Sequence, residues 1–366
     1  MPMPHGSAAA QRGGALRIVV PLLLLVVILA GVVVGFMVLY KQVWSASAFA
    51  ERYVENIADS DAAGALAMPG VTPQYDALEE IGRGTASEAL LRSSALTSEI
   101  TDIRAVGERS VAGDVTEVSV RYNLDGTARE SVFRIQPQES EGLVPSWGFE
   151  TSPLSVIDLT VRGSWRFSVN GFEIDKRQIS PAGLDADPLE PVSLLTFSPG
   201  DYEVAVDTTA TVADPETVVA TGPLDVVPLD VQTRPTSALT DVVQSSVDDF
   251  LDATCTTQNV LQPADCPFGF DTSWGIAQPD IEWSINDYPQ TALVPDGDGW
   301  KVSATSGTAH VNLSVQCYAG GFISVDQDVF FTMVADVEVQ DDGGVHITID
   351  RQGDPPPTPN LCAFPQ

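Results

Sequence analysis

Histidine, cysteine and basic residues are scarce in this chain, and each shortage disfavours a class of function. The 366 residues include three histidines, four cysteines and 18 Lys or Arg, against 50 Asp or Glu. The net charge of −32 repels nucleic acid, anionic lipid headgroups and anionic wall polymers, unless a divalent cation bridges them. The simplest interpretation of this charge is a solvated acidic surface that keeps the protein soluble.

Patterns of catalytic residues are also missing. His5 lies near the N-terminus, and His310 and His346 lie in alternating strand patterns, where a surface or half-buried histidine is ordinary. Residues 41–234 contain neither histidine nor cysteine, which excludes His-based triads and thiol nucleophiles there. There is no phosphate loop, dinucleotide fingerprint or LPxTG-type sorting signal. We therefore predict a protein that is not an enzyme, with no catalytic residues and no cofactor.

Charge is entirely absent between Ile18 and Tyr40. A helix of this length spans about 34 Å at about 1.5 Å per residue, enough to cross a bilayer's hydrocarbon core. The run has no polar face, which a buried helix of a soluble domain would need. We predict a single transmembrane helix over 18–40 after a cytoplasmic tail over 1–17, so that the membrane is a partner of this segment.

The few flanking charges set the predicted orientation. Arg12 and Arg17 precede the span and only Lys41 follows it closely, which favours a cytoplasmic N-terminus and an extracytoplasmic bulk. The alternative is a signal peptide cleaved after Ala48. The apolar core of a signal peptide is normally about 7 to 15 residues long, shorter than this run, so we favour an uncleaved anchor.

All four cysteines follow the predicted span, and none forms a Cys-x-x-Cys pair. An even number of cysteines in an exported chain predicts disulfides. Of the three connectivities we favour Cys255 with Cys266 and Cys317 with Cys362, the second of which would hold an otherwise loose tail to a sheet.

A weak calcium candidate is formed by Asp296 and Asp298, in the sequence Asp-Gly-Asp-Gly. Closely spaced carboxylates can hold calcium, but the remaining ligands of the twelve-residue calcium loop are absent. A hairpin turn is the favoured interpretation, because the four residues follow Pro295 and precede a strand pattern.

Residues 41–152 are predicted to begin with helices. Phe49, Tyr53 and Ile57 recur at a spacing of four, and no Pro or Gly separates them from the apolar run, so we expect the membrane helix to continue into this first helix. Further helices are predicted after Pro73 and at the capping box Thr85–Glu88.

The pattern of the same region then changes to a period of two. Val118 to Leu124 alternates, Asp125-Gly126 makes a two-residue hairpin turn, and Phe133 and Ile135 alternate on the return strand. An apolar run from Val144 to Phe149, with Trp147, closes the region. Helices followed by an antiparallel sheet are typical of an α+β roll.

Residues 153–234 show strand signals and no helix signal. Trp165, Phe167 and Val169 alternate up to the hairpin turn Asn170-Gly171, and a second turn at Pro199-Gly200 leads into the alternating strand of Tyr202. This pattern predicts a module built of strands, and the β-sandwich arrangement that we expect for it comes from a resemblance described below.

Residues 235–352 return to a helix followed by strands. Leu239, Val243, Val247 and Phe250 form one face of a helix over about 236–253. Alternating strands follow around Trp283 and over 300–318, 323–339 and 345–349. We predict a second helix-plus-antiparallel-sheet domain, either a repeat of the first or an independent one, and a proline-rich tail over 353–366. The predicted fold class is therefore α+β, with two or three small domains after the membrane helix.

Three resemblances accompany these patterns. The order from the Phe49 helix to the Asp125-Gly126 hairpin and Trp147 resembles the nuclear transport factor 2-like (cystatin-like) roll, and the Asn170-Gly171 hairpin followed by Pro-Gly-x-Tyr is similar to PEGA-type β-sandwich modules. The whole order resembles TcaA-type envelope proteins of Gram-positive bacteria, although the cysteine-rich zinc ribbon often seen at their start is missing. That family is associated with the cell envelope and with responses to wall-active antibiotics.

The resemblance implies a binding or scaffolding protein of the bacterial cell envelope, with an envelope protein or cell-wall component as partner. The alternative is a small-ligand receptor, or an enzyme based on carboxylates or a tyrosine, that uses the pocket of a roll domain. A pocket lined by converging Asp, Glu or Tyr favours this alternative, whereas one filled by Trp and Phe favours the scaffold.

Overall fold

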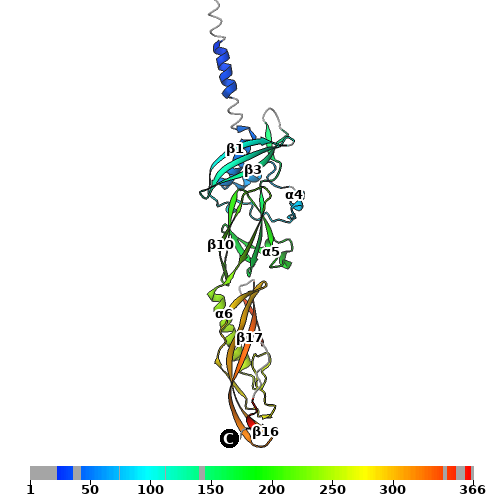
Figure 1. Cartoon of the computed structure of the whole chain (residues 1–366), viewed down its shortest axis with the longest axis vertical. Coiled ribbons are helices and arrows are strands. Elements are labelled where there is room, and N and C mark those ends of the chain that lie inside the picture. Colours follow the sequence, from blue (N-terminus) through cyan, green and yellow to red (C-terminus); the bar gives the residue numbers. More distant parts are fainter. Residues whose placement is uncertain are drawn as a thin grey trace, which may run out of the picture.

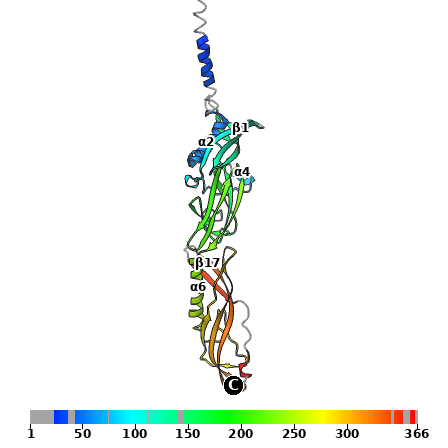
Figure 2. The same cartoon turned by 60° about the vertical axis from the view of Figure 1, so that its left-hand side comes forward.

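The computed structural model describes residues 23–35, 43–73, 75–111, 113–139, 145–340, 344–351 and 359–363. It is a mixed α+β structure in which strand residues outnumber helical ones and form several sheets. The elements are stacked along one long axis, with a helix at residues 23–35 at one end (Figures 1 and 2). We call the three stacked parts the N-terminal module (46–149), the middle module (155–235) and the C-terminal module (236–351).

The helix at residues 23–35 carries only apolar side chains and glycine and alanine. Its large side chains are 50% to 63% exposed, the values for Val33 and Val32 being the two extremes. Within the described part of the chain, no helix is both long enough and apolar enough to cross a bilayer. The predicted span of 18–40 lies only partly within the described residues and the predicted tail of 1–17 lies outside them, so both remain predictions.

The prediction that the membrane helix continues into the first module is wrong at Ser45. This residue has an extended backbone (φ −84°, ψ 164°), and its side-chain oxygen accepts a hydrogen bond of 3.1 Å from the Ala48 amide. A new helix, α2 (Ala46–Ala58), therefore begins there, because a serine cap satisfies one of its free amides.

The N-terminal module packs α2 on one face of a four-stranded antiparallel sheet. The helices α3 (Ala62–Leu66) and α4 (Tyr75–Glu80) precede strands in the order β1-β2-β3-β4, namely Ile100–Ser110, Thr116–Leu124, Thr127–Gln138 and Ser146–Phe149. Asp125 and Gly126 join β2 to β3 with positive φ values of 47° and 76°, as a two-residue hairpin turn requires. The alternation expected for Val118–Leu124 places its apolar residues against α2.

The capping box at Thr85–Glu88 does not start a helix. The Ser87 amide donates to the Ser193 carbonyl (2.8 Å), and the Leu195 amide donates to the Ser87 carbonyl (2.9 Å). Ser87 thus forms a β-bridge to a strand of the middle module, which takes up the backbone groups that a helix would use.

The middle module consists of two sheets. One has the order β12-β10-β9-β6-β7 and the other the order β11-β5-β8. The strands are β5 Ser155–Arg162, β6 Arg166–Val169, β7 Phe172–Asp175, β8 Val192–Thr196, β9 Gly200–Asp207, β10 Thr211–Ala220, β11 Val226–Gln232 and β12 Arg234–Pro235. The turn Asn170-Gly171 joins β6 to β7 as predicted, with positive φ at both residues.

The prediction that this module has no helix is wrong for one helical turn. After β7 comes the short helix α5 (Lys176–Ile179), which Asp175 caps by accepting a hydrogen bond of 3.0 Å from the Arg177 amide. The Lys176 ammonium is buried and donates to the carbonyls of Asp187, Pro188 and Glu190, so it holds the following loop in place. Burial lowers its pKa.

The N-terminal and middle modules share their cores. Val156, Leu195 and Phe197 of the middle module lie in the same buried cluster as α2 and its sheet, while Leu90 and Ala95 are buried among the strands of the middle module. The Arg83 guanidinium also pairs with the Asp158 carboxylate at 2.5 Å. The two modules therefore pack as one continuous body.

The C-terminal module starts with α6 (Ser237–Phe250), which continues as a π-helical turn over Leu251–Cys255. Its sheet has the order β13-β16-β17-β18, in which β14 and β15 also pair with β16. The strands are β13 Gly275–Ala277, β14 Glu282–Asp287, β15 Leu293–Asp296, β16 Gly299–Cys317, β17 Phe322–Val339 and β18 Val345–Arg351. Because β13, β14 and β15 follow one another along the same edge of β16, they occupy the place of one interrupted strand.

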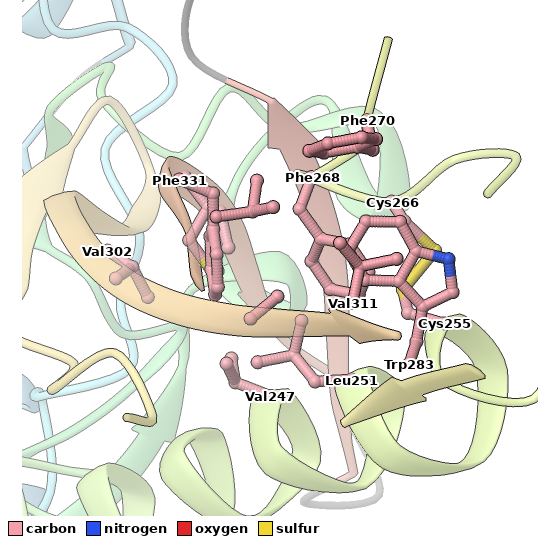
Figure 3. Close-up of a cluster of buried hydrophobic side chains, with 14 of the residues drawn as sticks. Val247, Leu251, Cys255, Cys266, Phe268, Phe270, Trp283, Val302, Val311 and Phe331 are labelled. Carbon is pink, nitrogen blue, oxygen red and sulfur yellow. A yellow bond between two sulfur atoms is a disulfide. The ribbon is translucent and has the colours of Figure 1, made fainter. Parts of the chain in front are cut away.

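Buried side chains fill the space between α6 and this sheet (Figure 3). Val247 and Leu251 from the helix face Val311 and Phe331 from the long strands, and the Phe268 ring lies 4.9 Å from that of Trp283. The predicted helical face of Leu239, Val243 and Val247 is buried, and Phe250 is partly buried beside it.

Candidate functional site

The main candidate site is a cleft of about 1160 Å³ between the middle and C-terminal modules. Its walls come from β6, β7, α5 and the β9–β10 turn on one side, and from the β15–β16 turn, β17 and β18 on the other. The cleft is therefore an arrangement of elements that are distant in the sequence.

The wall of the middle module carries an arginine and tryptophan cluster. The Arg177 guanidinium pairs with Asp175 at 2.6 Å and lies 5.1 Å from the centre of the Trp165 ring, while Arg166 lies 3.8 Å from the same carboxylate. The hydrogen bond from Arg177 is the largest cause of the lowered pKa of Asp175. The sequence pattern predicted only an alternating strand around Trp165 and did not indicate that Arg166, Asp175 and Arg177 would gather beside it.

The wall of the C-terminal module is acidic. Lys301 lies 3.8 Å from Asp296 and 3.6 Å from Asp336, so one ammonium serves two carboxylates. Glu338 stands opposite His346 across the β17–β18 pair. These residues were missed as a group, because they are separate in the sequence and meet only through strand register.

Trp300 and Gly163 meet where the two walls join. Trp300 is 3% exposed, and its indole nitrogen has no hydrogen-bond partner. A methyl group placed on Gly163 would lie 2.5 Å from Oγ1 of Thr233, 3.1 Å from Cζ2 of Trp300 and 3.5 Å from Cε2 of the same ring. Gly163 therefore leaves room for Thr233 and the Trp300 ring to pack against the backbone at this end of the cleft.

The calcium candidates lie at the rim of the cleft. Asp296 and Asp298 belong to the hairpin turn between β15 and β16, where Asp296 pairs with Gly299 and Gly297 has a φ of 60°. No group of three or more His, Cys, Asp or Glu side chains in the described residues is placed to hold a metal ion. The structure therefore gives calcium binding no further support.

The disulfides lie away from the cleft and have the connectivity favoured from the sequence. Cys255–Cys266 joins the end of α6 to the following loop, with 5.7 Å between the Cα atoms, and Cys317–Cys362 joins β16 to the described end of the tail, with 5.8 Å. Both stabilise the C-terminal module, and no free cysteine occurs among the residues described.

His310 lies on the outer face of β16 rather than in the cleft. Its Nδ1 is 2.8 Å from Asp328 and its Nε2 is 3.2 Å from Asp326. Asn286 donates a further hydrogen bond of 2.8 Å to Asp328. This arrangement ties β14, β16 and β17 together.

The face of the N-terminal sheet that α2 covers is filled by aromatic rings. The Tyr53 ring centre lies 5.8 Å from that of Phe133 and 5.0 Å from that of Phe149, and Phe49 lies 5.1 Å from Phe149. Burial raises the pKa of Tyr53 well above its usual value, which disfavours the phenolate that a tyrosine-based enzyme would use.

The comparisons with known proteins add no assignment. No family model, curated protein or solved structure matches the chain.

Proposed function

We propose that this chain is a single-pass, membrane-anchored binding or scaffolding protein of the bacterial cell envelope that holds non-enzymatic modules outside the membrane. In this proposal the N-terminal and C-terminal modules are nuclear transport factor 2-like rolls and the middle module is a β-sandwich, as in TcaA-type proteins. The partner is an envelope protein or a cell-wall component.

One observation carries the proposal. The helix at residues 23–35 exposes its leucines and valines at one end of an elongated stack (Figure 1), whereas the folded modules bury most of theirs. An exposed, uncharged apolar helix is stable only in an apolar solvent such as a bilayer, and the stack then extends away from that surface.

Two further features agree with an extracytoplasmic location and a scaffold. Disulfides persist in oxidising compartments, and this chain has two. The N-terminal and C-terminal modules each have a helix followed by an antiparallel sheet whose strands are adjacent in chain order. In the C-terminal module β13, β14 and β15 together take the place of the first strand. In both, core side chains fill the space between helix and sheet, which favours the scaffold over a receptor or enzyme that uses a roll pocket.

The test is membrane fractionation of the full chain expressed in a bacterium. Leu25→Arg combined with Val32→Arg should release the protein from the membrane pellet, because an arginine at the centre of a span costs about 2.5 to 3.5 kcal/mol. The matched control is Val242→Arg with Val260→Arg, two exposed valines of the C-terminal module, which should leave the protein in the pellet.

A reporter fused after Gln366 should be active outside the cytoplasm. Activity only in the cytoplasm would reject the proposed location. A mature chain that begins near Phe49 and is recovered from the medium would reject the anchor.

A further inference from the structure

We propose that one end of the N-terminal module docks on the zwitterionic headgroup layer of the bilayer that holds the predicted anchor. The contact is made by Val43, Trp44, Arg52 and Trp147, which we call the membrane-side surface. It is a second membrane contact, distinct from the span of 18–40, and it rests on the anchored role proposed above.

The length of the linker places this surface at the bilayer. Val43 is three residues beyond Tyr40, the last residue of the apolar run, and Trp44 is the next. An extended chain covers at most about 3.6 Å per residue, so the Cα atom of Trp44 lies within about 14 Å of that of Tyr40. The headgroup layer on each side of the hydrocarbon core is about 5 to 8 Å thick. With the span in the bilayer, Trp44 therefore lies in this layer or directly beside it.

Two hydrogen bonds hold the folded module against the linker. The Trp147 indole nitrogen donates to the Trp44 carbonyl at 2.9 Å. The Arg52 guanidinium donates to the Val43 carbonyl at 3.1 Å. Trp147 belongs to β4 and Arg52 to α2, so both the sheet and the helix of the module are tied to the residues nearest the membrane. Figure 1 shows this module beside the helix at residues 23–35, with the other modules beyond it.

The side chains of this surface suit the boundary between lipid and water. Trp44 and Trp147 are partly exposed, and Val43 is 43% exposed. Tryptophan is enriched at membrane interfaces, because its large ring is amphipathic. The tryptophans of the C-terminal module are instead buried in its core. Partly exposed tryptophans beside the linker are therefore placed where a bilayer would cover them.

A hollow of about 280 Å³ in this surface selects the class of lipid. It is lined by Val43, Trp44, Ala48, Glu51, Arg52 and Glu55. The exposed Arg52 guanidinium attracts a lipid phosphate, and the exposed Glu55 carboxylate attracts an ammonium group. The net charge of −32 repels anionic headgroups. A headgroup with both a phosphate and an ammonium, as in phosphatidylethanolamine, meets both side chains.

The first experiment measures quenching of tryptophan fluorescence in the full chain, reconstituted into phosphatidylcholine and phosphatidylethanolamine vesicles with brominated or ordinary acyl chains. Trp147→Phe should reduce the quenched intensity by about one half, because only Trp44 then remains near the bromines. Trp165→Phe, in the middle module, should leave the quenched intensity unchanged. Trp44→Phe should reduce it wherever the module lies, because Trp44 is close to the span.

Vesicle flotation separates the docking from the anchor. Quenching that falls in Trp44→Phe but not in Trp147→Phe, with the chain still floating, would show that the chain spans and that the module hangs free. That result rejects the docking and keeps the anchor. A chain that does not float with the vesicles rejects both.

The second experiment changes the lipid and needs no substitution at a tryptophan. Vesicles of brominated phosphatidylglycerol should quench the wild-type chain about twofold less than the zwitterionic vesicles, and about 0.5 M NaCl should reduce this difference. Arg52→Gln should lower the quenching in zwitterionic vesicles, whereas Arg234→Gln, at an exposed position of the middle module, should not. Equal quenching in both lipids, or equal effects of the two arginine variants, would reject the selection of a zwitterionic headgroup.

Discussion

At the scale of single residues, burial decides which ion pairs matter. Arg83 and Asp158 join two modules with side chains 33% and 10% exposed, and Ser193 donates a further hydrogen bond of 2.7 Å to the same carboxylate. Arg162 and Asp230 make a similar pair at 2.8 Å, but with side chains 40% and 54% exposed. Solvent screens the second pair more strongly, so the two pairs should differ in their contribution to stability.

Arg83→Gln should lower the free energy of unfolding by about 2 kcal/mol, because it leaves a largely buried carboxylate with one hydrogen bond instead of a bidentate partner. Arg162→Gln is the matched control and should cost less than about 1 kcal/mol. Urea denaturation measures both. Equal costs for the two variants would contradict the role of burial.

Asp201 should make stability depend on pH. Burial, and then the neighbouring Asp125 carboxyl, raises the pKa of Asp201 above its ordinary value in the folded protein. The native state therefore binds more protons than the unfolded state between the ordinary and the raised pKa, so the contribution of Asp201 to stability falls as pH rises through that window.

Asp201→Asn should therefore stabilise the protein at pH 7, and this gain should shrink as the pH falls and disappear below about pH 4. Thermal melts of variant and wild type between pH 3.5 and about 7.5 give the difference directly. Asp241→Asn, at an exposed position of α6, is the control. A gain that grows toward acidic pH would be the opposite of this expectation.

At the scale of elements, several helices begin where a side chain caps them, and one capping signal fails where strand pairing competes. Ser45, Asp61, Asp175 and Thr236 each accept a hydrogen bond from an amide of the helix that they precede. The sequence of Thr85–Glu88 has the same signal, but its backbone pairs with Ser193 and Leu195 instead. A local capping signal is therefore overruled when a neighbouring strand offers hydrogen bonds and its core accepts Leu90.

Thr236 should stabilise both the start of α6 and the contact between the middle and C-terminal modules. Its hydroxyl accepts from the Leu239 amide (3.2 Å) and donates to the Thr209 carbonyl of the β9–β10 turn (2.7 Å), so it joins the middle and C-terminal modules. Thr236→Ala should lower the free energy of unfolding by about 1 to 2 kcal/mol, and Thr236→Ser should restore most of it.

The control for this prediction is Thr240→Ala. The Thr240 hydroxyl donates only to the Thr236 carbonyl within the helix, so its loss should change the free energy of unfolding by less than about 0.5 kcal/mol. Urea denaturation followed by tryptophan fluorescence compares the three variants. A Thr236→Ala cost no larger than that of Thr240→Ala would show that the cap and the link to Thr209 contribute nothing.

At the scale of the whole molecule, the buried clusters of the described residues divide the three modules into two packed bodies. The N-terminal and middle modules share buried clusters, whereas the C-terminal module has its own, to which the middle module contributes Ala210. Figure 2 shows α6 and β17 in a part of the stack separate from the part that carries α2 and β1. The cleft lies at this boundary, so its walls belong to different bodies.

Calorimetric unfolding of the full chain should therefore show two transitions. Leu90→Ala should lower the midpoint temperature of the transition that belongs to the combined N-terminal and middle modules, and Leu251→Ala that of the transition of the C-terminal module. Each change should reduce the free energy of unfolding of its own body by about 2 to 5 kcal/mol, since both leucines are fully buried. A variant that shifts both transitions equally would indicate one cooperative unit.

The sequence by itself determined the elements whose signals are local. Alternation and two-residue turns predicted the hairpins at Asp125-Gly126 and Asn170-Gly171, a helical face predicted α6, and cysteine spacing favoured the disulfide pairing that the structure has. Local signals suffice in these cases because turn geometry, side-chain period and chain reach act over a few residues.

Only the tertiary structure decided what depends on contacts between distant segments. It placed Ser87 in a β-bridge, paired β11 with β5 in parallel, and brought Trp165, Trp300 and Glu338 to one cleft. Such contacts depend on which surfaces bury one another, and this is set by the packing of whole modules and leaves no periodic trace in the sequence.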